Sequence, residues 1–192
     1  MDAKGFPQQP AWDEAIRQKP AFHIMAGDNT YSDSTKYHII RDHHLQQRRI
    51  ANFASLIANV PTYATWDDHD YGPNDSHRLT PGKEESLRAF KDLWANPTYG
   101  TKEIPGVFYS FEWGDVQFFV MDDRYHRDDE HTPRPKGKTQ FGEAQRNWLL
   151  SGLKKSKATF KVVVNGYDIR GSRYPDEIKV ISRYINQNRI PG

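Results

Sequence analysis

The chain has 192 residues, of which 36% are hydrophobic and 27% charged, a balance typical of a folded globular domain and too apolar for a disordered chain. It contains no cysteine, which excludes disulfides, thiolate metal sites and a thiol nucleophile, so any metal must bind through oxygen and imidazole ligands. The formal charge is +2, with acids and bases interleaved along the chain, so we expect no nucleic-acid-binding patch and no polybasic membrane patch.

No apolar run approaches the roughly 18 residues that a membrane span requires. The first ten residues, MDAKGFPQQP, lack the basic-then-apolar pattern of a signal peptide. Either the chain stays inside the cell or a leader has been removed, and the sequence leaves both open. We find no internal repeat and expect one domain over residues 1–192. Nothing in the sequence indicates an oligomeric state.

The first half of the chain predicts two helices and two strands. A short apolar run that ends in Gly27-Asp28 is typical of a buried strand feeding a loop. Pro61 ends a long helical stretch and precedes a second strand. In chain order we expect a helix at 12–19, a strand at 21–26, a helix at 37–59 and a strand at 62–66.

The second half predicts a hairpin, a further strand and three helices. Gly114-Asp115 lies between two strand-like runs and is a strong hairpin signal. The apolar run FKVVVN indicates a buried strand. In chain order we expect a helix at 84–94, strands at 107–113 and 116–122, a helix at 143–154, a strand at 160–165 and a helix at 175–188.

Acidic residues follow three of these strands. Asp28 comes after the first, Asp67 and Asp68 after the second, and Asp122 and Asp123 after the fourth. In layered α/β proteins, ligands gather at the carboxyl ends of the strands. This shared placement predicts a ligand site.

The segment GDNTY combines a flexible turn with two possible metal ligands. Asp28 can bind a hard cation, Gly27 lets the backbone turn tightly, and Tyr31 can return its phenolic oxygen toward the same ion. The alternative is that Asp28 caps a helix while Tyr31 packs against the core. The residues alone leave both interpretations open.

The run Asp67-Asp68-His69-Asp70 places four ionisable residues at one strand end. Like charges this close raise each other's pKa, and a bound cation is the usual means of neutralising them. The alternative is an exposed acidic turn with a solvated His69. The apolar strand and Trp66 before the run favour partial burial, and therefore the cation site.

Arg124 and Asn74 are weaker candidates, each with two interpretations. Arg124 can clamp a phosphate through two hydrogen bonds, or pair with Asp122 or Asp123 for structure. Asn74 can offer an amide oxygen to a metal, or only shape a turn. Four other histidines show no metal-binding spacing and are expected to be structural or exposed: His23, His38, His43 and His44.

Four motifs in this order resemble the alkaline phosphatase D (PhoD-like) metallophosphatase family: GDNTY, WDDHDYGPND, GDVQFFVMDDR and KATFKVVVNG. The match runs through nearly the whole chain, and GDxxY followed by WDDHD is a specific combination. The resemblance implies a four-layer αββα metallophosphoesterase-like sandwich with mixed sheets, incomplete in this chain. Strands that alternate with helices independently indicate an α/β fold.

The resemblance also implies a two-metal centre, with Fe³⁺ and Ca²⁺ expected and Mn²⁺ or Mg²⁺ as alternatives. Asp28 looks like the acid that bridges both metals, and Tyr31 like a ligand to the iron-type ion. Asp68 stands where related phosphoesterases carry a metal-binding Asn before a His. His69 would contact the phosphate or help the leaving group depart. Three further residues are expected in the same site: Asp67, Asn74 and Arg124.

The family pattern contains ligands that these residues lack. A Gly-Ser-Cys segment usually supplies an early ligand and a Gly-Asp-x-His segment a late histidine, so we expect the metal cage to be incomplete within residues 1–192. Residues 165–175 are short where the family commonly carries an insertion. Members of the family are often exported to the periplasm or secreted.

The implied function is a metal-dependent phosphoester hydrolase that activates water and acts on small phosphomonoesters or phosphodiesters. Two alternatives stay open. The first is a catalytically incomplete domain that only binds a cation or phosphate, which metal analysis would distinguish. The second is a glycoside hydrolase that uses the acids at 67–70 and 122–123, which would stay active in the presence of a chelator.

Overall fold

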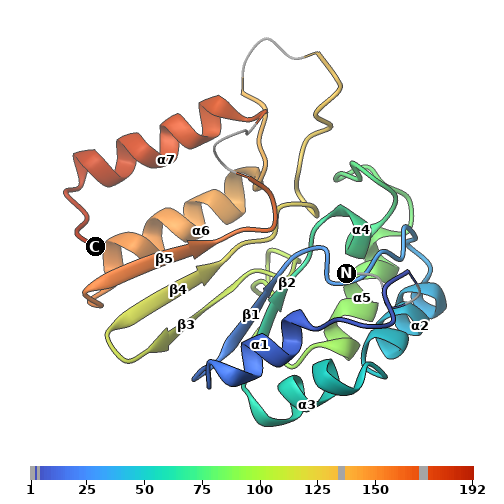
Figure 1. The fold of residues 1–192 in the computed structure, drawn as a ribbon. Coiled ribbons are helices and arrows are strands. Elements are labelled where there is room, and N and C mark those ends of the chain that lie inside the picture. Colours follow the sequence, from blue (N-terminus) through green and yellow to red (C-terminus); the bar gives the residue numbers. More distant parts are fainter. Residues whose placement is uncertain (1–2, 4, 134–136, 169–172) are drawn as a thin grey trace. The chain divides into compact units, whose positions relative to one another are not determined.

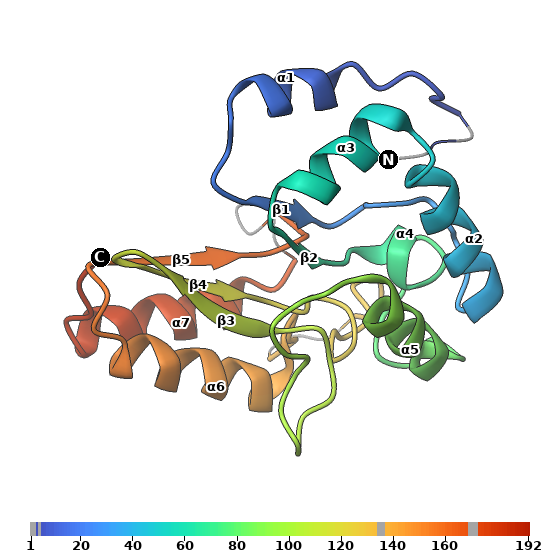
Figure 2. The ribbon, with the colours of Figure 1, turned by 90° about the horizontal axis from the view of Figure 1, so that it is seen from below.

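The computed structural model describes residue 3 and residues 5–133, 137–168 and 173–192. The chain divides into two units, each with its own sheet and its own helices (Figures 1 and 2). Unit 1 comprises Met1–Asn74 and Thr80–Asn96, and unit 2 comprises Asp75–Leu79 and Pro97–Gly192. The prediction of one domain over residues 1–192 stays a prediction. Among the described residues, no helix is both long enough and apolar enough to cross a bilayer.

Unit 1 is built on two parallel strands, in which Ala26 at the end of β1 pairs with Thr65 at the end of β2. Both strands therefore end at the same edge, and the loops that follow them begin side by side. Trp12 packs against His23 of β1 and Phe53 of α3. The elements of unit 1 are α1 (Ala11–Arg17), β1 (His23–Ala26), α2 (Tyr37–Gln47), α3 (Ala51–Asn59), β2 (Thr62–Thr65), α4 (Asp68–Tyr71) and α5 (Lys83–Leu93).

The single helix that the sequence pattern predicts over residues 37–59 is wrong, because two helices, α2 and α3, occupy this stretch. The chain between them turns to an extended backbone at Ile50, with φ −68° and ψ 114°. Arg48 donates from Nη2 to the carbonyl of Leu93 at 2.6 Å. Gln47 exchanges two side-chain hydrogen bonds with Gln9, at 3.1 and 2.7 Å. These tertiary contacts at the end of α2 outweigh the small free energy that continuing the helix would contribute.

Trp66 fixes the start of the acidic run at the end of β2. Its ring is fully buried and meets the rings of Tyr71 and Phe90 edge-on, at centroid distances of 5.0 and 5.3 Å. Burial of a ring of this size anchors the backbone on which the next residues stand. The buried Trp66 therefore holds the backbone at the start of the acidic run in position.

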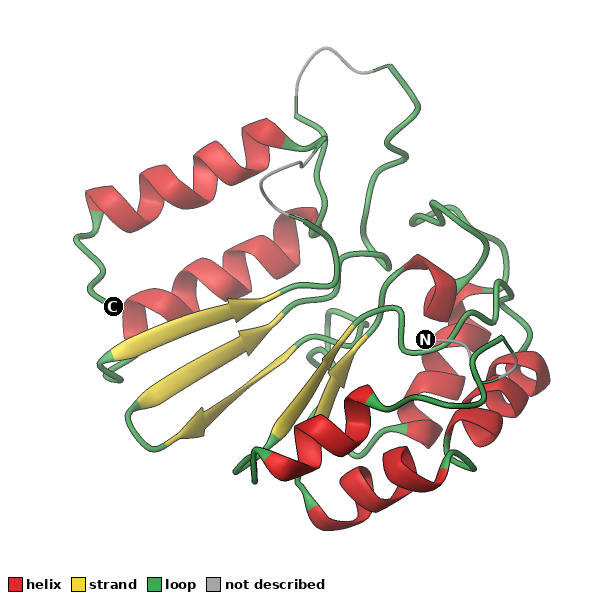
Figure 3. Ribbon diagram, viewed as in Figure 1, coloured by secondary structure: helices red, strands yellow, loops and turns green. Residues whose placement is uncertain are grey.

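Unit 2 contains a three-stranded mixed sheet, in the order β3-β4-β5 (Figure 3). β3 and β4 form the predicted hairpin, in which Trp113 pairs with Val116 and Gly114 has a positive φ of 58°, as the first position of a two-residue turn requires. β4 and β5 run parallel. The elements of unit 2 are β3 (Tyr109–Trp113), β4 (Val116–Val120), α6 (Gly142–Lys155), β5 (Phe160–Val164) and α7 (Pro175–Gln187).

Helices α6 and α7 cover one face of the sheet of unit 2 (Figure 2). The core beneath them contains Phe119, Met121, Phe141, Leu149 and Leu153. This packing forms an apolar layer between the sheet and the two helices.

The prediction that the FKVVVN strand is buried is wrong for one of its faces. β5 lies at the edge of the β3-β4-β5 sheet, and its alternate residues Phe160 and Val162 are 59% and 38% exposed. Val163, on the opposite face, packs against the core cluster. A short apolar run fits a half-buried edge strand as well as a buried one, so periodicity alone does not distinguish them. Part of the short stretch at 165–175, residues 169–172, lies outside the described residues.

Candidate metal centre

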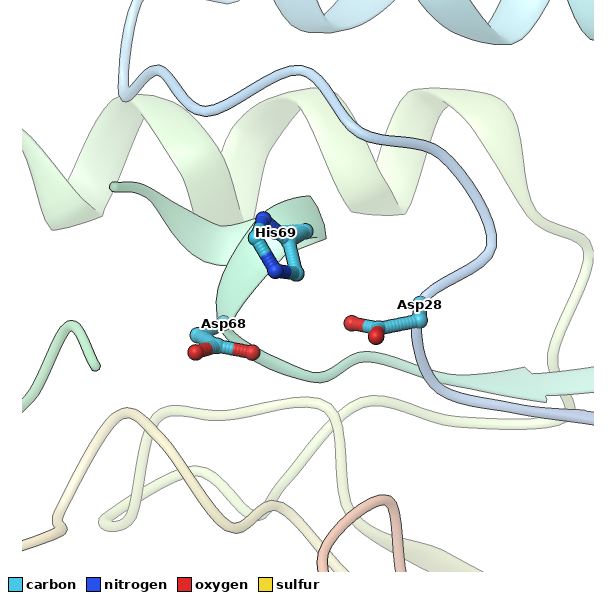
Figure 4. A group of neighbouring side chains, drawn as sticks. All are labelled: Asp28, Asp68 and His69. Atoms are coloured by element: carbon cyan, nitrogen blue, oxygen red, sulfur yellow. The ribbon is translucent and has the colours of Figure 1, made fainter. Parts of the chain in front are cut away.

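The loops that follow β1 and β2 bring Asp28, Asp68 and His69 together (Figure 4). Each residue offers one ligand atom, and these three atoms lie within 4.8 Å of one another. Asp68 is buried, whereas Asp28 and His69 are half-buried. Figure 4 shows Asp28 coming from the loop after β1 and the other two from the start of α4, with the side chains directed toward a common point. This convergence makes the group a candidate metal centre.

A left-handed turn directs Asp28 into the group. Gly27 and Asp28 have φ values of 98° and 49°, a region that Gly adopts freely and Asp tolerates better than most residues. The hydroxyl of Tyr31 donates to Oδ2 of Asp28 at 2.9 Å. The GDNTY segment thus brings its two predicted ligands into direct contact.

Asp70 connects the two loops. It is fully buried, and its Oδ2 accepts hydrogen bonds from the backbone N–H groups of Asn29 at 3.1 Å and Asp67 at 3.2 Å. Its Oδ1 accepts one from the N–H of Thr30 at 2.9 Å. Burial raises the pKa of Asp70 to about 7, against the opposing effect of these backbone hydrogen bonds. One carboxylate therefore holds the backbone beside Asp28 and the backbone before α4.

His69 is held by a carboxylate and an aromatic ring. Its Nδ1 lies 2.5 Å from Oδ1 of Asp33, and its ring stacks on that of Tyr31 at a centroid distance of 4.1 Å. Burial by itself lowers the pKa of His69, but the hydrogen bond with Asp33 and the charges of Asp68, Asp28 and Asp33 together raise it. The imidazole is therefore oriented, and it holds its proton above its ordinary pH range.

Tyr31 can act as a metal ligand only when a cation is bound beside it. Burial, followed by the hydrogen bond to Asp28, raises the pKa of Tyr31 to about 12. A nearby cation has the opposite effect and favours the phenolate. Two carboxylates, one imidazole and one phenol form a donor set that suits hard and borderline cations, with the phenol suited to Fe³⁺. The residues present therefore fit a metal site.

Three other predicted site residues are not part of the group formed by Asp28, Asp68 and His69. Asp67 is the N-cap residue of α4 and forms a reciprocal capping box with Asp70. Asn74 is exposed at the end of the first segment of unit 1. Arg124 belongs to unit 2, where it is buried, donates from Nη1 to the carbonyl of Ser76 at 3.3 Å and has its Nε 3.8 Å from Asp123. Their assignment to the metal site stays a prediction.

Two supporting residues escaped the sequence analysis. Asp33 lies in a polar stretch after GDNTY, and its contact with His69 joins residues 36 positions apart, so no local pattern reveals it. Asp70 stands in the acidic run, but its role depends on full burial, which composition does not show. Within DDHD, the sequence does not show which residues are candidate ligands and which support the backbone. That distinction requires the structure of the loop after β1.

A second group of possible ligands consists of Asp75, Glu130 and His131 in unit 2. Glu130 already pairs with two guanidinium groups, those of Arg127 and Arg173, the latter with Nε 3.7 Å from Oε1. Positive side chains thus balance the charge of Glu130 without a cation. The Asp28, Asp68 and His69 group is therefore the better candidate metal centre.

Carboxylates and a histidine at the ends of two parallel strands lie where α/β folds usually bind ligands. The model of the PhoD-like phosphatase family matches residues 38–187, and the chain belongs to this family. Alkaline phosphatase D of Bacillus subtilis (strain 168) is 26% identical, over 64% of this chain and 25% of that protein.

A solved structure of PhoD matches the chain with a TM-score of 0.76 at 18% identity, covering 93% of this chain and 45% of the other. The predicted family and the predicted α/β fold with mixed sheets are thereby confirmed. The chain spans a quarter of the curated relative and under half of the solved structure.

Proposed function

We propose that this chain carries a metal-dependent phosphoester hydrolase site for small phosphomonoesters or phosphodiesters. The observation that supports this most directly is the convergence of Asp28, Asp68 and His69 at the ends of two parallel strands. Membership of the PhoD-like phosphatase family supports the same reaction class.

The proposed cofactors are two cations, Fe³⁺ and Ca²⁺, with Mn²⁺ or Mg²⁺ as alternatives. When bound, they supply Lewis-acid activation of water and neutralise charge on the phosphoryl oxygens. Asp28 would hold both cations, while Asp68 and Tyr31 would each bind one. The carboxylates and the phenol match the oxygen preference of these ions.

His69 would act on the phosphate itself. Asp33 occupies Nδ1 of the ring, which leaves Nε2 to hydrogen-bond a phosphoryl oxygen or give a proton to the departing alcohol. In the metal-free protein, burial lowers the pKa of His69, but the hydrogen bond with Asp33 and the charges of the neighbouring carboxylates together raise it. Stacking on Tyr31 restricts rotation of the imidazole. Together these contacts orient a proton donor beside the cluster of acids.

The test combines metal analysis with hydrolysis of p-nitrophenyl phosphate. Asp28→Asn and Asp68→Asn should each reduce turnover by at least about a hundredfold and lower the bound metal, because each removes a ligand charge. Asp42→Asn, an exposed acid of α2 that lies beside Arg41, is the matched control and should leave both unchanged. Near-normal turnover in both site variants would remove the metal-centre assignment.

A second candidate function is binding of a cation or phosphate without catalysis. The described residues bring together three carboxylate and imidazole ligands, fewer than two cations need. This candidate predicts that phosphate binds to the metal-loaded protein while p-nitrophenyl phosphate is not hydrolysed. Hydrolysis that depends on Asp28 and Asp68 would exclude it.

A further inference from the structure

A cavity of about 730 Å³ lies in unit 1 beside the candidate metal centre. Its lining comes from two parts of the chain, Phe6 with residues 8–11 and Tyr31 with Asp33. This volume is within the range of about 300–1,000 Å³ that is usual for small-molecule sites. The cavity is therefore large enough for an organic group of moderate size.

Hydrogen bonds within unit 1 hold the N-terminal wall of the cavity in place. Oε1 of Gln9 accepts hydrogen bonds from Nε1 of Trp12 at 2.6 Å and from Nε2 of Gln47 at 2.7 Å. Nε2 of Gln9 donates to the carbonyl of Phe6 at 3.0 Å, and Asn52 donates to the carbonyl of Gln9 at 2.8 Å. The buried Gln9 side chain thus uses its polar atoms inside the wall. The surface that this wall presents to a ligand is therefore mainly apolar.

Two side chains belong both to the cavity and to the surroundings of the metal centre. Tyr31 lines the cavity, bonds Asp28 through its hydroxyl and stacks on His69. Asp33, the one carboxylate in the lining, bonds Nδ1 of His69. If a phosphoryl group binds at the metal centre, only the side chains of Tyr31 and Asp33 would therefore separate its ester group from the cavity.

We propose that this cavity binds the organic group of the phosphoester, and that the preferred substrates carry an aromatic group next to the phosphate. The inference rests on the proposed function and adds the substrate class. Phe6 and Tyr31 offer aromatic rings, and Pro10 and Ala11 add apolar surface. Aromatic rings pack favourably against flat apolar groups in offset or edge-to-face geometry. A small hydrophilic alcohol would leave this surface uncovered.

Direct binding measurements test the proposal without turnover. Phenylphosphonate, methylphosphonate and inorganic phosphate are titrated into the metal-loaded protein by calorimetry, since the carbon–phosphorus bond of the phosphonates is not hydrolysed. We expect phenylphosphonate to bind about tenfold more tightly than methylphosphonate, because a ring that is partly buried gains part of the free energy of full burial.

Variants of Phe6 identify the cavity as the source of this preference. Phe6 is 68% exposed, so its replacement should not unfold the chain. Phe6→Ala should reduce the preference to less than about threefold, as ring contact is lost, while Phe6→Tyr keeps the ring and the preference. Leu79→Ala removes an apolar side chain of unit 2 that is 74% exposed and should change nothing. None of these variants should alter binding of inorganic phosphate.

Equal binding of the two phosphonates by the unmodified protein would overturn the proposal. A preference for phenylphosphonate that survives Phe6→Ala undiminished would overturn it as well. If neither phosphate nor either phosphonate binds, the proposed function itself is refuted, and this inference falls with it. The inorganic phosphate titration therefore separates the two failures.

Discussion

One buried side chain, His44 of α2, should make a contribution to stability that falls as the pH is lowered from about 7 to about 5. The imidazole is buried, with Nδ1 3.2 Å from Nη1 of Arg48 and its ring edge-on to Trp94 at 5.7 Å. Nε2 has no hydrogen-bond partner within the described residues. Burial, followed by the charge of Arg48, lowers the pKa of His44 from 6.5 to about 3.

The sign of this pH dependence follows from which state of the chain, folded or unfolded, binds the proton at the higher pH. The pKa of His44 is 6.5 in the unfolded chain and about 3 in the folded one, so between these values the unfolded state binds the proton and the folded state does not. The stabilising contribution of neutral His44 is fully present above the unfolded value and is lost as the pH falls toward the folded value. From about pH 7 to about pH 5, this group alone should lower the free energy of unfolding by about 2 kcal/mol.

Urea unfolding at several pH values measures this contribution. His44→Gln removes the titrating group while its amide oxygen can still accept from Arg48. On going from about pH 7 to about pH 5, the free energy of unfolding of the variant should therefore rise by about 2 kcal/mol relative to that of the wild type. His38→Gln, at an exposed position of the same helix, controls for the loss of a histidine. If the free energy of unfolding of the wild type and of His44→Gln changes by the same amount over this interval, the argument from burial is refuted.

Two further predictions concern the metal centre and the second unit. Asp33→Asn removes the negative charge of Asp33 and replaces a charged acceptor of His69 with a neutral amide oxygen, so an NMR titration of the metal-free protein should show a lower His69 pKa than in the wild type. An unchanged value would contradict this contact. Gly152→Ala should destabilise the protein by about 1–3 kcal/mol in urea unfolding, because the added Cβ would lie 2.5 Å from Cε1 of the buried Phe119. This clash should outweigh the higher helix propensity of Ala. A more stable variant would show that α6 can shift.

The position of the candidate metal centre could be predicted because its signals are local. Asp28 and Asp68 each follow a short apolar strand, and parallel pairing of those strands brings their ends to one edge. The Gly114-Asp115 hairpin could be predicted equally well, since two residues determine the turn. Each of these predictions needs only a pattern of neighbouring residues together with one rule of sheet geometry.

Features that depend on distant partners could not be predicted. The break between α2 and α3 follows from contacts of Gln47 and Arg48 with Gln9 and Leu93, about 40 positions away. The exposure of Phe160 and Val162 on β5 depends on which face of the sheet the helices α6 and α7 cover. The burial of His44 depends on packing against α5 and the residue after it. Tertiary contacts decide these features, and helix or strand preference contributes little.

The carboxylate of Asp70 has a consequence for protein engineering. Because it accepts hydrogen bonds from main-chain amides of both loops, it holds the backbone beside Asp28 and the backbone before α4 through groups that a change of the Asp68 side chain leaves in place. The candidate ligand Asp68 can therefore be exchanged, for instance to test ion preference, with these main-chain hydrogen bonds retained. A change in reactivity after such an exchange would report coordination chemistry rather than collapse of the surrounding architecture.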